Sequence, residues 1–337
     1  MKFLITKDEH LMLGFRNKFR KPGWEEDMIK KHEFIIKYMI KNNIKYKITT
    51  GDIFDKQKTW TFKQYIANKR ILEMYKKANI EIISIAGNHD MIEGRLDISE
   101  SPFEEMVKDE LINYIGNKSL IFRNENECVE VQGIDYRYIN DLYTKQDFFN
   151  EILNLHWVDE STFRILVLHQ NITPNSERVT EFTYKELSEI AQKRNINTII
   201  CGHYHVGFES QNINNVLFIN PWNLWRVVRD YNVKEELHTP EFYILETKDN
   251  SIERIEVPHK IYSQAFDLKE VDFYKKIKKE NKHFFEFAES FKNLSNIEDE
   301  NDLQILHNFI SEIKEKYNLN ENDINRIFKE LSSYFES

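Results

Sequence analysis

Short runs of β-branched and aliphatic residues alternate with longer amphipathic segments over the first 220 residues. Apolar runs that end at polar or glycine residues predict strands at 2–6, 44–50, 80–86, 163–169, 197–203 and 215–220. Apolar residues at helical spacing predict helices over 25–43, 61–79, 102–115 and 183–194. This alternation is typical of layered α/β folds, in which helices cover the faces of a sheet.

The chain changes character after the last of these strands. Strands at 241–246 and 251–258 flank the sequence KDN and predict a closing hairpin. From residue 267 the pattern is charged and helical, with apolar stripes over 302–319 and 321–335. We expect an α/β protein with a layered β-sandwich core flanked by helices and a C-terminal helical appendage. Its predicted divisions are a core at 1–230, a β-rich closing element at 231–266 and a helical region at 267–337.

The aromatic stretch at 283–291 has two interpretations. A small helical bundle would bury these rings internally, which we favour for most of them. A small appendage often cannot bury all its apolar surface, so some rings could instead bind a partner.

Side chains that commonly bind metals follow five of the predicted strands. They are Asp8 and His10, Asp52 and Asp55, Asn88 with His89 and Asp90, His169, and His203 with His205. Each motif alone fits a cap or a satisfied core polar group as well as a ligand. Ligands of α/β sheets gather at the carboxyl ends of strands, however, and five such ends in succession predict one shared site.

The residue types at these strand ends favour transition metals. Carboxylates and imidazoles together suit borderline divalent cations such as manganese, iron, zinc or nickel. Two cations about 4 Å apart need a bridging anion to screen their repulsion. Asp52 suits that role because it follows Gly51 at the exit of a central strand.

Composition limits the remaining classes. The chain has 337 residues and a net charge of -9, so it is not a globally basic nucleic-acid binder. Two cysteines argue for a reducing compartment and against a disulfide framework. The first residues do not resemble a signal peptide, and no apolar run reaches the length of a membrane span. We expect a cytoplasmic protein with no membrane contact.

The ordered motifs D-x-H, G-D-x-x-D, G-N-H-D, H and G-H-x-H resemble those of the calcineurin-like metallophosphoesterase superfamily. The resemblance covers the first two thirds of the chain and implies a metallophosphoesterase fold with two divalent cations. Manganese is the expected metal, with magnesium, iron and zinc as alternatives.

The resemblance also implies a role for each motif residue. One cation would be held by Asp8, His10, Asp52 and His205. The other would be held by Asp52, Asn88, His169 and His203. His89 would stabilise the transition state and protonate the leaving oxygen, Asp90 would orient His89, and Asp55 would brace the ligands from behind.

Within the superfamily the chain is most similar to the SbcD-type nuclease subunit, including its phage recombination versions. The similarity lies in the sequences TTGDIFD and IAGNHD, in the β-rich element after GHYH and in the helical C-terminus. It implies a DNA exonuclease and endonuclease of an SbcCD-like repair complex, present as a homodimer. An SMC-like ATPase of the SbcC type would bind the C-terminal helices. A phage-encoded protein would act in the host cytoplasm.

The chain departs from that pattern in two places. His10 is followed by LMLG rather than directly by glycine, and INPWNLWR at 219–226 replaces a Pro-Gly-Ser turn. These departures affect the expected substrate-side loop and leave the ligand motifs intact.

Local basic residues near the motifs are candidate DNA contacts. They are Arg16, Lys18, Arg20, Lys21 and Arg226, which lie among aromatic residues. Basic and aromatic side chains together can hold a phosphate backbone or stack on a base. A solvated loop tethered by its aromatic rings would have the same composition.

Two other functions fit the same scaffold. A stand-alone phosphoesterase would act on a small-molecule or protein phosphoester. A non-catalytic scaffold would keep the fold and lose the chemistry, but here every expected ligand is present together with His89.

Overall fold

The computed structural model describes residues 1–15, 19–55, 60–92, 95, 97–116, 118–158, 162–175, 181–225, 238–269 and 271. The chain divides into two compact units, Met1–Asp267 and Leu268–Ser337. The described residues belong almost wholly to the first unit. The helices predicted at 302–319 and 321–335 and the aromatic stretch at 283–291 lie outside them.

The first sheet has the strand order β14-β13-β1-β2-β3-β4. Its strands are β1 (Lys2–Thr6), β2 (Tyr46–Thr49), β3 (Glu81–Ser84), β4 (Asn113–Tyr114), β13 (Glu241–Glu246) and β14 (Ser251–Glu256). Strands β1 to β4 are parallel, so their carboxyl ends meet at one edge of the sheet. The antiparallel pair β13–β14 confirms the predicted closing hairpin, and β13 pairs with β1.

The second sheet has the order β11-β12-β10-β7-β6-β5. Its strands are β5 (Ser119–Arg123), β6 (Cys128–Ile134), β7 (Phe163–Gln170), β10 (Thr198–His203), β11 (Phe208–Ile213) and β12 (Val216–Asn220). The central strands β6, β7, β10 and β12 are parallel, and β5 and β11 are antiparallel edges. Two short strands, β8 (Ile172–Thr173) and β9 (Phe182–Thr183), form a separate pair.

The core lies in three layers. One cluster contains Phe3, Ile5 and Ile48 from the first sheet together with inward-facing residues of the second, so the sheets pack face to face. Leu4, between Phe3 and Ile5, belongs to the cluster under the helices because successive strand residues face opposite ways. A third cluster lies between the second sheet and its own helices.

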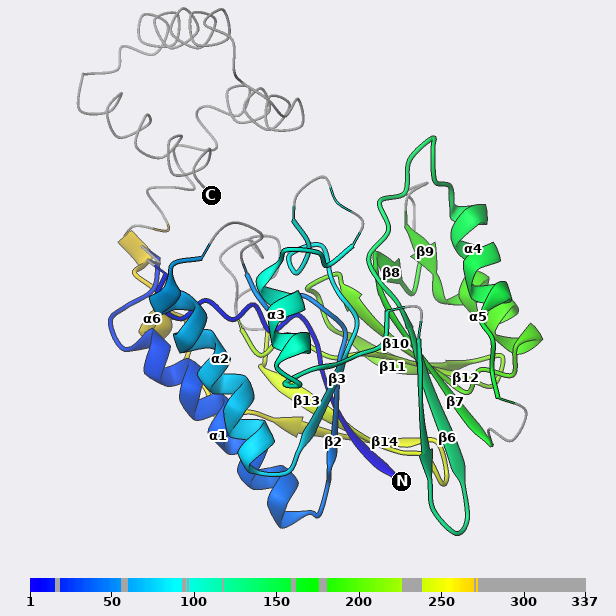
Figure 1. Ribbon diagram of the computed structural model, residues 1–337, viewed down its shortest axis with the longest axis horizontal. Coiled ribbons are helices and arrows are strands. Elements are labelled where there is room, and N and C mark those ends of the chain that lie inside the picture. The colour runs from blue at the N-terminus through cyan, green and yellow to red at the C-terminus, as the bar shows by residue number, and fades with distance from the viewer. Residues whose placement is uncertain are drawn as a thin grey trace, which may run out of the picture. The chain divides into compact units, whose positions relative to one another are not determined.

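Helices cover the outer faces of both sheets. Figure 1 shows α1 (Trp24–Lys41) and α2 (Phe62–Lys77) on one side, and α4 (Lys145–Asn154) and α5 (Tyr184–Lys193) on the other. Helices α2, α4 and α5 begin with reciprocal capping boxes, which satisfy free backbone N–H groups. The short helix α6 covers Tyr262–Ala265. No helix among the described residues is both long and apolar enough to cross a membrane.

The predicted fold class, a mixed α/β protein with layered sheets, is confirmed. The helix predicted over 102–115 is wrong in its second half, because α3 ends at Lys108 and Asn113–Tyr114 form β4. Glu110 has a φ of 55°, a left-handed conformation that a right-handed helix cannot contain. The predicted division limits at 230 and 266 stay predictions, although the strands after residue 240 belong to the first sheet.

Candidate metal centre

The predicted ligand residues lie at the carboxyl ends of strands from both sheets. Asp8 and His10 follow β1, Asp52 follows β2, and Asn88 follows β3. In the second sheet, His169 lies at the end of β7 and His203 ends β10. Because the sheets face each other, these ends bring residues from widely separated parts of the sequence together.

The backbone turns sharply at several of these residues. Asp8, His10, Asp52 and His203 all have positive φ angles, of 42°, 43°, 46° and 79°. Non-glycine residues adopt this region rarely, although Asp and His do so more readily than most others. Such conformations persist where the surrounding structure fixes them, and they cluster at functional sites.

Two glycines allow other backbone to approach the turns closely. A Cβ on Gly87 would lie 2.2 Å from Asp52 Oδ1, and a Cβ on Gly202 would lie 2.2 Å from Thr50 Oγ1 and 3.0 Å from Asp8 Oδ1. The 2.2 Å separations are too short for real atoms. Gly87 therefore leaves room for the Asp52 carboxylate, and Gly202 leaves room for the Thr50 side chain beside Asp8.

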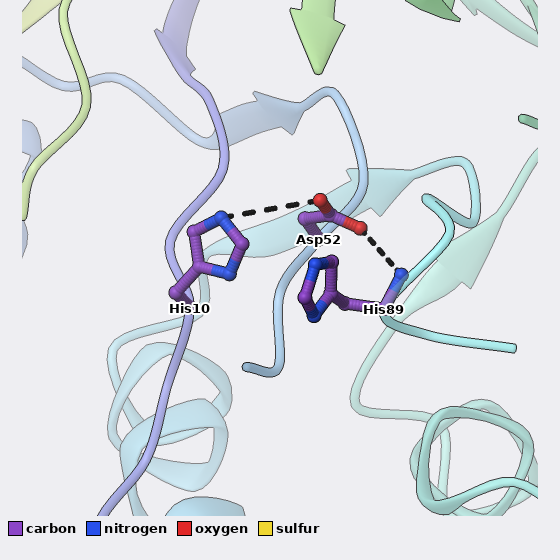
Figure 2. Close-up of side chains that lie close together, drawn as sticks. All are labelled: His10, Asp52 and His89. Atoms are coloured by element: carbon purple, nitrogen blue, oxygen red, sulfur yellow. Dashed lines mark hydrogen bonds and ion pairs between the residues drawn. The ribbon is translucent and has the colours of Figure 1, made fainter. Parts of the chain in front are cut away.

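The first ligand group contains His10, Asp52 and His89, whose donor atoms lie within 4.8 Å of one another. Figure 2 shows both histidine rings beside the Asp52 carboxylate. His10 Nε2 lies 3.9 Å from Asp52 Oδ2, and the backbone N–H of His89 donates to Asp52 Oδ1 at 2.8 Å. The two rings meet edge to face with centroids 5.1 Å apart.

The second ligand group contains Asp52, His169 and His203. His169 Nε2 lies 3.3 Å from Asp52 Oδ2 and 3.2 Å from His203 Nδ1. Asn88 Oδ1 lies 3.2 Å from the same nitrogen of His169. Asp52 belongs to both groups, so one carboxylate could bridge two cations.

Asp8 and His205 complete the predicted ligand set. The Asp8 carboxylate accepts the backbone N–H of His203 at 3.2 Å, and its Oδ1 lies 3.7 Å from His169 Nδ1. His205 Nε2 lies 3.0 Å from His10 Nε2. The structure therefore brings all seven predicted ligand residues into one continuous cluster.

The close approach of ring nitrogens tests whether this cluster fits divalent cations. His10 and His205 face each other through their Nε2 atoms, and His169 and His203 do so through Nε2 and Nδ1. Neutral imidazoles carry lone pairs on the nitrogens that bind metals. Converging imidazole nitrogens with a shared carboxylate match the donor set of manganese, iron or zinc, so the residues fit.

Charge in the cluster favours bound cations. Burial raises the pKa of Asp52, but the charges of His169 and His89 outweigh burial and hold that pKa well below its usual range. Burial lowers the pKa of His10, while the hydrogen bond to Asp55 and the charge of Asp52 raise it to about 9. Buried carboxylates in this cluster thus attract positive charge.

Two further histidines of the cluster shift in opposite directions. For His169, burial lowers the pKa, but the charge of Asp52 raises it to about 9. For His203, burial and the neighbouring His169 lower the pKa to about 3. The lowered pKa keeps His203 in the neutral form that binds a metal, whereas a cation bound at His169 would displace the proton of that ring.

Asp90 lies behind the ligands. Its carboxylate accepts backbone N–H groups of Ile53, Phe54 and Gly87 at 3.0 to 3.3 Å, which ties the loop after β2 to the loop after β3. Burial and the charge of Asp52 raise the pKa of Asp90 to about 7.

His89 and His10 both contact Asp55. His89 Nδ1 lies 2.8 Å from the Asp55 carbonyl oxygen, and His10 Nδ1 lies 3.3 Å from Asp55 Oδ1. The contacts of Asp55 agree with a brace behind His10. An orienting role of Asp90 toward His89 stays a prediction, because these contacts fix the His89 ring through Asp55.

The predicted DNA contacts are placed in part. Arg16, Lys18 and Arg226 lie outside the described residues. The Arg20 guanidinium lies over the Phe266 ring at 4.2 Å, and Lys21 Nζ donates to the Ser263 carbonyl at 2.9 Å. The described pair therefore contacts the segment around α6.

Sequence reasoning missed three residues around the cluster. Lys7 and Glu9 alternate with Asp8 and His10 and are fully buried. Their charge directly after a strand was a signal that could have identified them. Tyr136 follows β6, which was not predicted, and its ring lies 5.0 Å from the ring of His203.

Known proteins with a similar sequence belong to a family that fits this site. Residues 1–207, more than half of the chain, match the calcineurin-like phosphoesterases. The chain belongs to the calcineurin-like phosphoesterase family. The family confirms the predicted superfamily and identifies the protein as a hydrolase. Its members use divalent metals, and the histidine and aspartate groups fit such ions.

A relative with an assigned role is the DNA double-strand break repair protein Mre11 of Archaeoglobus fulgidus. It is 25% identical to this phosphoesterase over an alignment of 221 residues, and the match covers 61% of this chain and 46% of that protein. The chain thus aligns with about half of the relative's length. The match to a protein named for double-strand break repair supports the predicted similarity to the SbcD-type subunit.

Two solved structures share low similarity with this phosphoesterase. A hypothetical protein from Thermus thermophilus has 11% identity and a TM-score of 0.44, covering 77% of this chain and 100% of its own. A novel phosphatase from Mycoplasma pneumoniae has 12% identity and a TM-score of 0.41, covering 79% and 94%.

Proposed function

We propose that this phosphoesterase hydrolyses DNA phosphodiester bonds as the nuclease subunit of an SbcCD-like repair complex. The observation that carries the chemistry is Asp52, which belongs to two groups of potential ligands at once. The DNA substrate is supported by the 25% identity to a protein named for double-strand break repair. Manganese is the proposed metal, and it is one of the divalent cations that a mixed set of imidazole and carboxylate ligands suits.

Each ligand residue has a proposed partner ion. Asp8, His10 and His205 would hold one cation and Asn88, His169 and His203 the other, with Asp52 shared. Two bound cations would acidify a shared water and polarise the phosphoryl group. The chain itself contributes the fixed orientation of its ligands, because the strand ends and turns hold them before substrate binds.

His89 is the proposed acid of the reaction. Its side chain is half-buried and its Nδ1 lies 2.8 Å from the Asp55 carbonyl oxygen. We assign the other ring nitrogen, Nε2, to the contact with substrate. There it would donate a hydrogen bond to the phosphoryl oxygens and a proton to the leaving oxygen. The carbonyl of Asp55 would keep Nδ1 protonated and so fix the ring orientation.

The test is a nuclease assay on end-labelled duplex and hairpin DNA with added manganese, with and without a candidate SMC-like ATPase. We expect cleavage that EDTA abolishes and that the Asp52→Asn variant lacks. Manganese binding measured on the same preparations distinguishes a variant that no longer binds metal from one that binds metal but does not cleave DNA. Absence of DNA cleavage by metal-loaded protein would contradict the proposal.

A stand-alone phosphoesterase is the second candidate. It is favoured by the contacts of Arg20 and Lys21, which lie on Phe266 and Ser263 and so are partly occupied within the chain. Hydrolysis of mononucleotides or of bis-p-nitrophenyl phosphate by protein that leaves duplex ends intact would establish this alternative. Metal-loaded protein that hydrolyses none of these substrates would instead be a scaffold.

The partner and assembly proposals concern the rest of the chain. We propose that residues 267–337 bind the SMC-like ATPase and that the protein is a homodimer. The support for the partner is the similarity to a break-repair protein and the apolar stripes predicted in that region.

A further inference from the structure

Lys7 is a buried lysine at the edge of the metal centre. It follows β1 directly, precedes the predicted ligand Asp8, and has a relative exposure of 0%. Moving an ammonium group out of water costs several kcal/mol unless its protons are accepted. The contacts that accept these protons therefore show what the side chain holds in place.

Two of the acceptors lie on either side of His205. Lys7 Nζ donates to the Tyr204 carbonyl at 2.7 Å and approaches the Val206 carbonyl at 3.4 Å. It also donates to the side-chain oxygen of Asn220, the last residue of β12. One ammonium thus joins the end of β1 in the first sheet to two segments of the second sheet.

The segment that Lys7 binds connects two strands. β10 ends at His203 and β11 begins at Phe208, so Tyr204, His205 and Val206 lie outside both strands. His205 Nε2 must nevertheless stay 3.0 Å from His10 Nε2. Lys7 binds the backbone carbonyls of the residues before and after His205, and these contacts limit the rotation of that peptide segment.

We propose that Lys7 is a positioning residue that holds His205 in place as a metal ligand. The inference rests on the proposed metal centre and adds to it a residue that does not itself contact the cation. Groups that orient ligands from behind typically change metal affinity by about 10- to 100-fold when they are removed. Lys7 has this effect on the cation shared by Asp8, His10 and His205, and not on the other cation.

Other buried lysines provide the contrast. Lys47 contacts the Glu9 carboxylate, and Lys31 donates to the Leu224 carbonyl at 2.5 Å and lies 4.5 Å from the centroid of the Trp225 ring. Neither of these contacts involves the segment around His205. Lys31 is therefore a matched control, since it is a buried lysine that also donates to a backbone carbonyl.

The test measures manganese binding to the full chain by titration calorimetry, with bound metal counted after dialysis. Lys7→Met keeps the length of the side chain and removes its charge. We expect one of two manganese ions to bind at least about tenfold more weakly, while the other keeps its affinity. Lys31→Met should bind both ions as the parent does.

His205→Ala separates this inference from the proposed metal centre. The single variant should bind the same manganese ion more weakly. The double variant Lys7→Met with His205→Ala should lose little further affinity, because Lys7 acts through His205. Parental binding of both ions by His205→Ala would overturn the proposed ligand set. If His205→Ala lowers the manganese affinity and Lys7→Met does not, only the role of Lys7 is overturned. The same follows if the losses of affinity from the two substitutions add fully in the double variant.

Asn220→Leu provides a second variant if Lys7→Met does not fold. It removes one acceptor of the ammonium at the end of β12 and leaves both carbonyls. The Lys7 side chain is then less restrained, and the affinity for the same manganese ion should fall severalfold. Parental affinity for both ions in a folded Asn220→Leu protein, judged by circular dichroism, would overturn the inference.

Discussion

Backbone conformation at single residues shapes this site as much as the choice of side chains does. Asp8, His10, Asp52 and His203 adopt left-handed conformations that cost about 1 to 3 kcal/mol each for non-glycine residues. These turns aim side chains of nearby residues, such as Asp8 and His10, into one cluster. The cost is tolerated because neighbouring backbone packs tightly on the turns.

Gly87→Ala should remove metal binding without unfolding the protein. The new Cβ would lie 2.2 Å from Asp52 Oδ1 and 2.5 Å from the Asp52 backbone nitrogen, so the carboxylate that we propose as the bridge must move. We expect loss of both manganese ions in calorimetric titration. Gly23→Ala is the control for a glycine replaced away from the site. Its φ of 84° makes the substitution strained, but the new Cβ would meet only the end of the Glu26 side chain. Two ions bound by Gly87→Ala would contradict the predicted crowding.

His89→Ala should keep both manganese ions and lose about a hundredfold or more of its nuclease rate, the usual contribution of a general acid. Metal analysis and single-turnover cleavage on one preparation check both parts. The donor atoms of His89 lie within 4.8 Å of those of His10 and Asp52. Loss of an ion in this variant would therefore make His89 a ligand and contradict its role as acid.

His32 should make the protein less stable as the pH falls. Burial lowers its pKa from 6.5 to about 4, although the charge of Glu9 opposes that shift. Between these two pH values the unfolded chain binds a proton at His32 that the folded chain does not bind. The contribution of His32 to stability is therefore fully present above pH 6.5 and is lost as the pH falls toward 4. The full loss is on the order of 3 kcal/mol.

His32→Gln should lack this pH dependence. Urea unfolding of parent and variant at about pH 7.5, 6 and 5, in EDTA, measures the difference in free energy between them. The advantage of the parent should shrink by about 2 kcal/mol between the highest and lowest pH, because other titrating groups cancel in the comparison. A difference that stays constant with pH would show that His32 does not titrate in this range.

At the residue scale, the sequence predicted the residues that converge in the cluster, but not most of the contacts that hold them there. Asp8, Asp52 and His203 stand at strand ends, which an apolar run followed by glycine or polar residues reveals. Asp90 contacts the loop after β2, and Lys7 contacts residues almost 200 positions away or more in the second sheet. No local pattern encodes these contacts, because they depend on how strands pair and how the two sheets pack.

At the scale of elements, strands with continuous apolar runs were predicted well, whereas the central strand β6 was missed. β1, β7 and β10 match their predicted ranges to within one residue. β6 was not predicted because Glu130 and Gln132 interrupt it, yet both are buried. Gln132 donates to Glu130 at 2.8 Å, so side-chain hydrogen bonding replaces the apolar pattern that a buried strand usually shows.

A buried ion pair joins β1 and β2 beneath the site. Glu9 accepts from Thr6 Oγ1 at 2.6 Å and from Lys47 Nζ, and Lys47 lies over the Tyr75 ring of α2. Burial raises the pKa of Glu9, but the charge of Lys47 outweighs burial and lowers it. The segment from β1 to His10 is therefore fixed from behind as well as from the side.

Lys47→Met should destabilise the protein by about 3 to 5 kcal/mol, because it leaves the Glu9 carboxylate buried without its partner. Chemical unfolding near neutral pH measures the loss. The double variant Glu9→Gln with Lys47→Met should recover much of it, since no charge is then left buried. A single variant as unstable as the double one would argue against an ion pair that matters to stability.

At the scale of the whole molecule, the described site residues all belong to the unit Met1–Asp267. A protein that ends at Val271, whose side chain is buried, should keep manganese-dependent cleavage of single-stranded DNA. It should lose co-purification with the SMC-like ATPase, because residues 272–337 contain the apolar stripes assigned to that partner. Retained co-purification would contradict the partner assignment, and the full chain is the control.

The two facing sheets divide the proposed ligands between early and late parts of the sequence. Asp8 to Asn88 come from the first sheet, whereas His169 to His205 come from the second. A ribosome must therefore release more than half of the polypeptide before any cation finds a complete set of donors. Metal loading would then report that both halves have docked, and the ion acquired would be drawn from the pool present when folding ends.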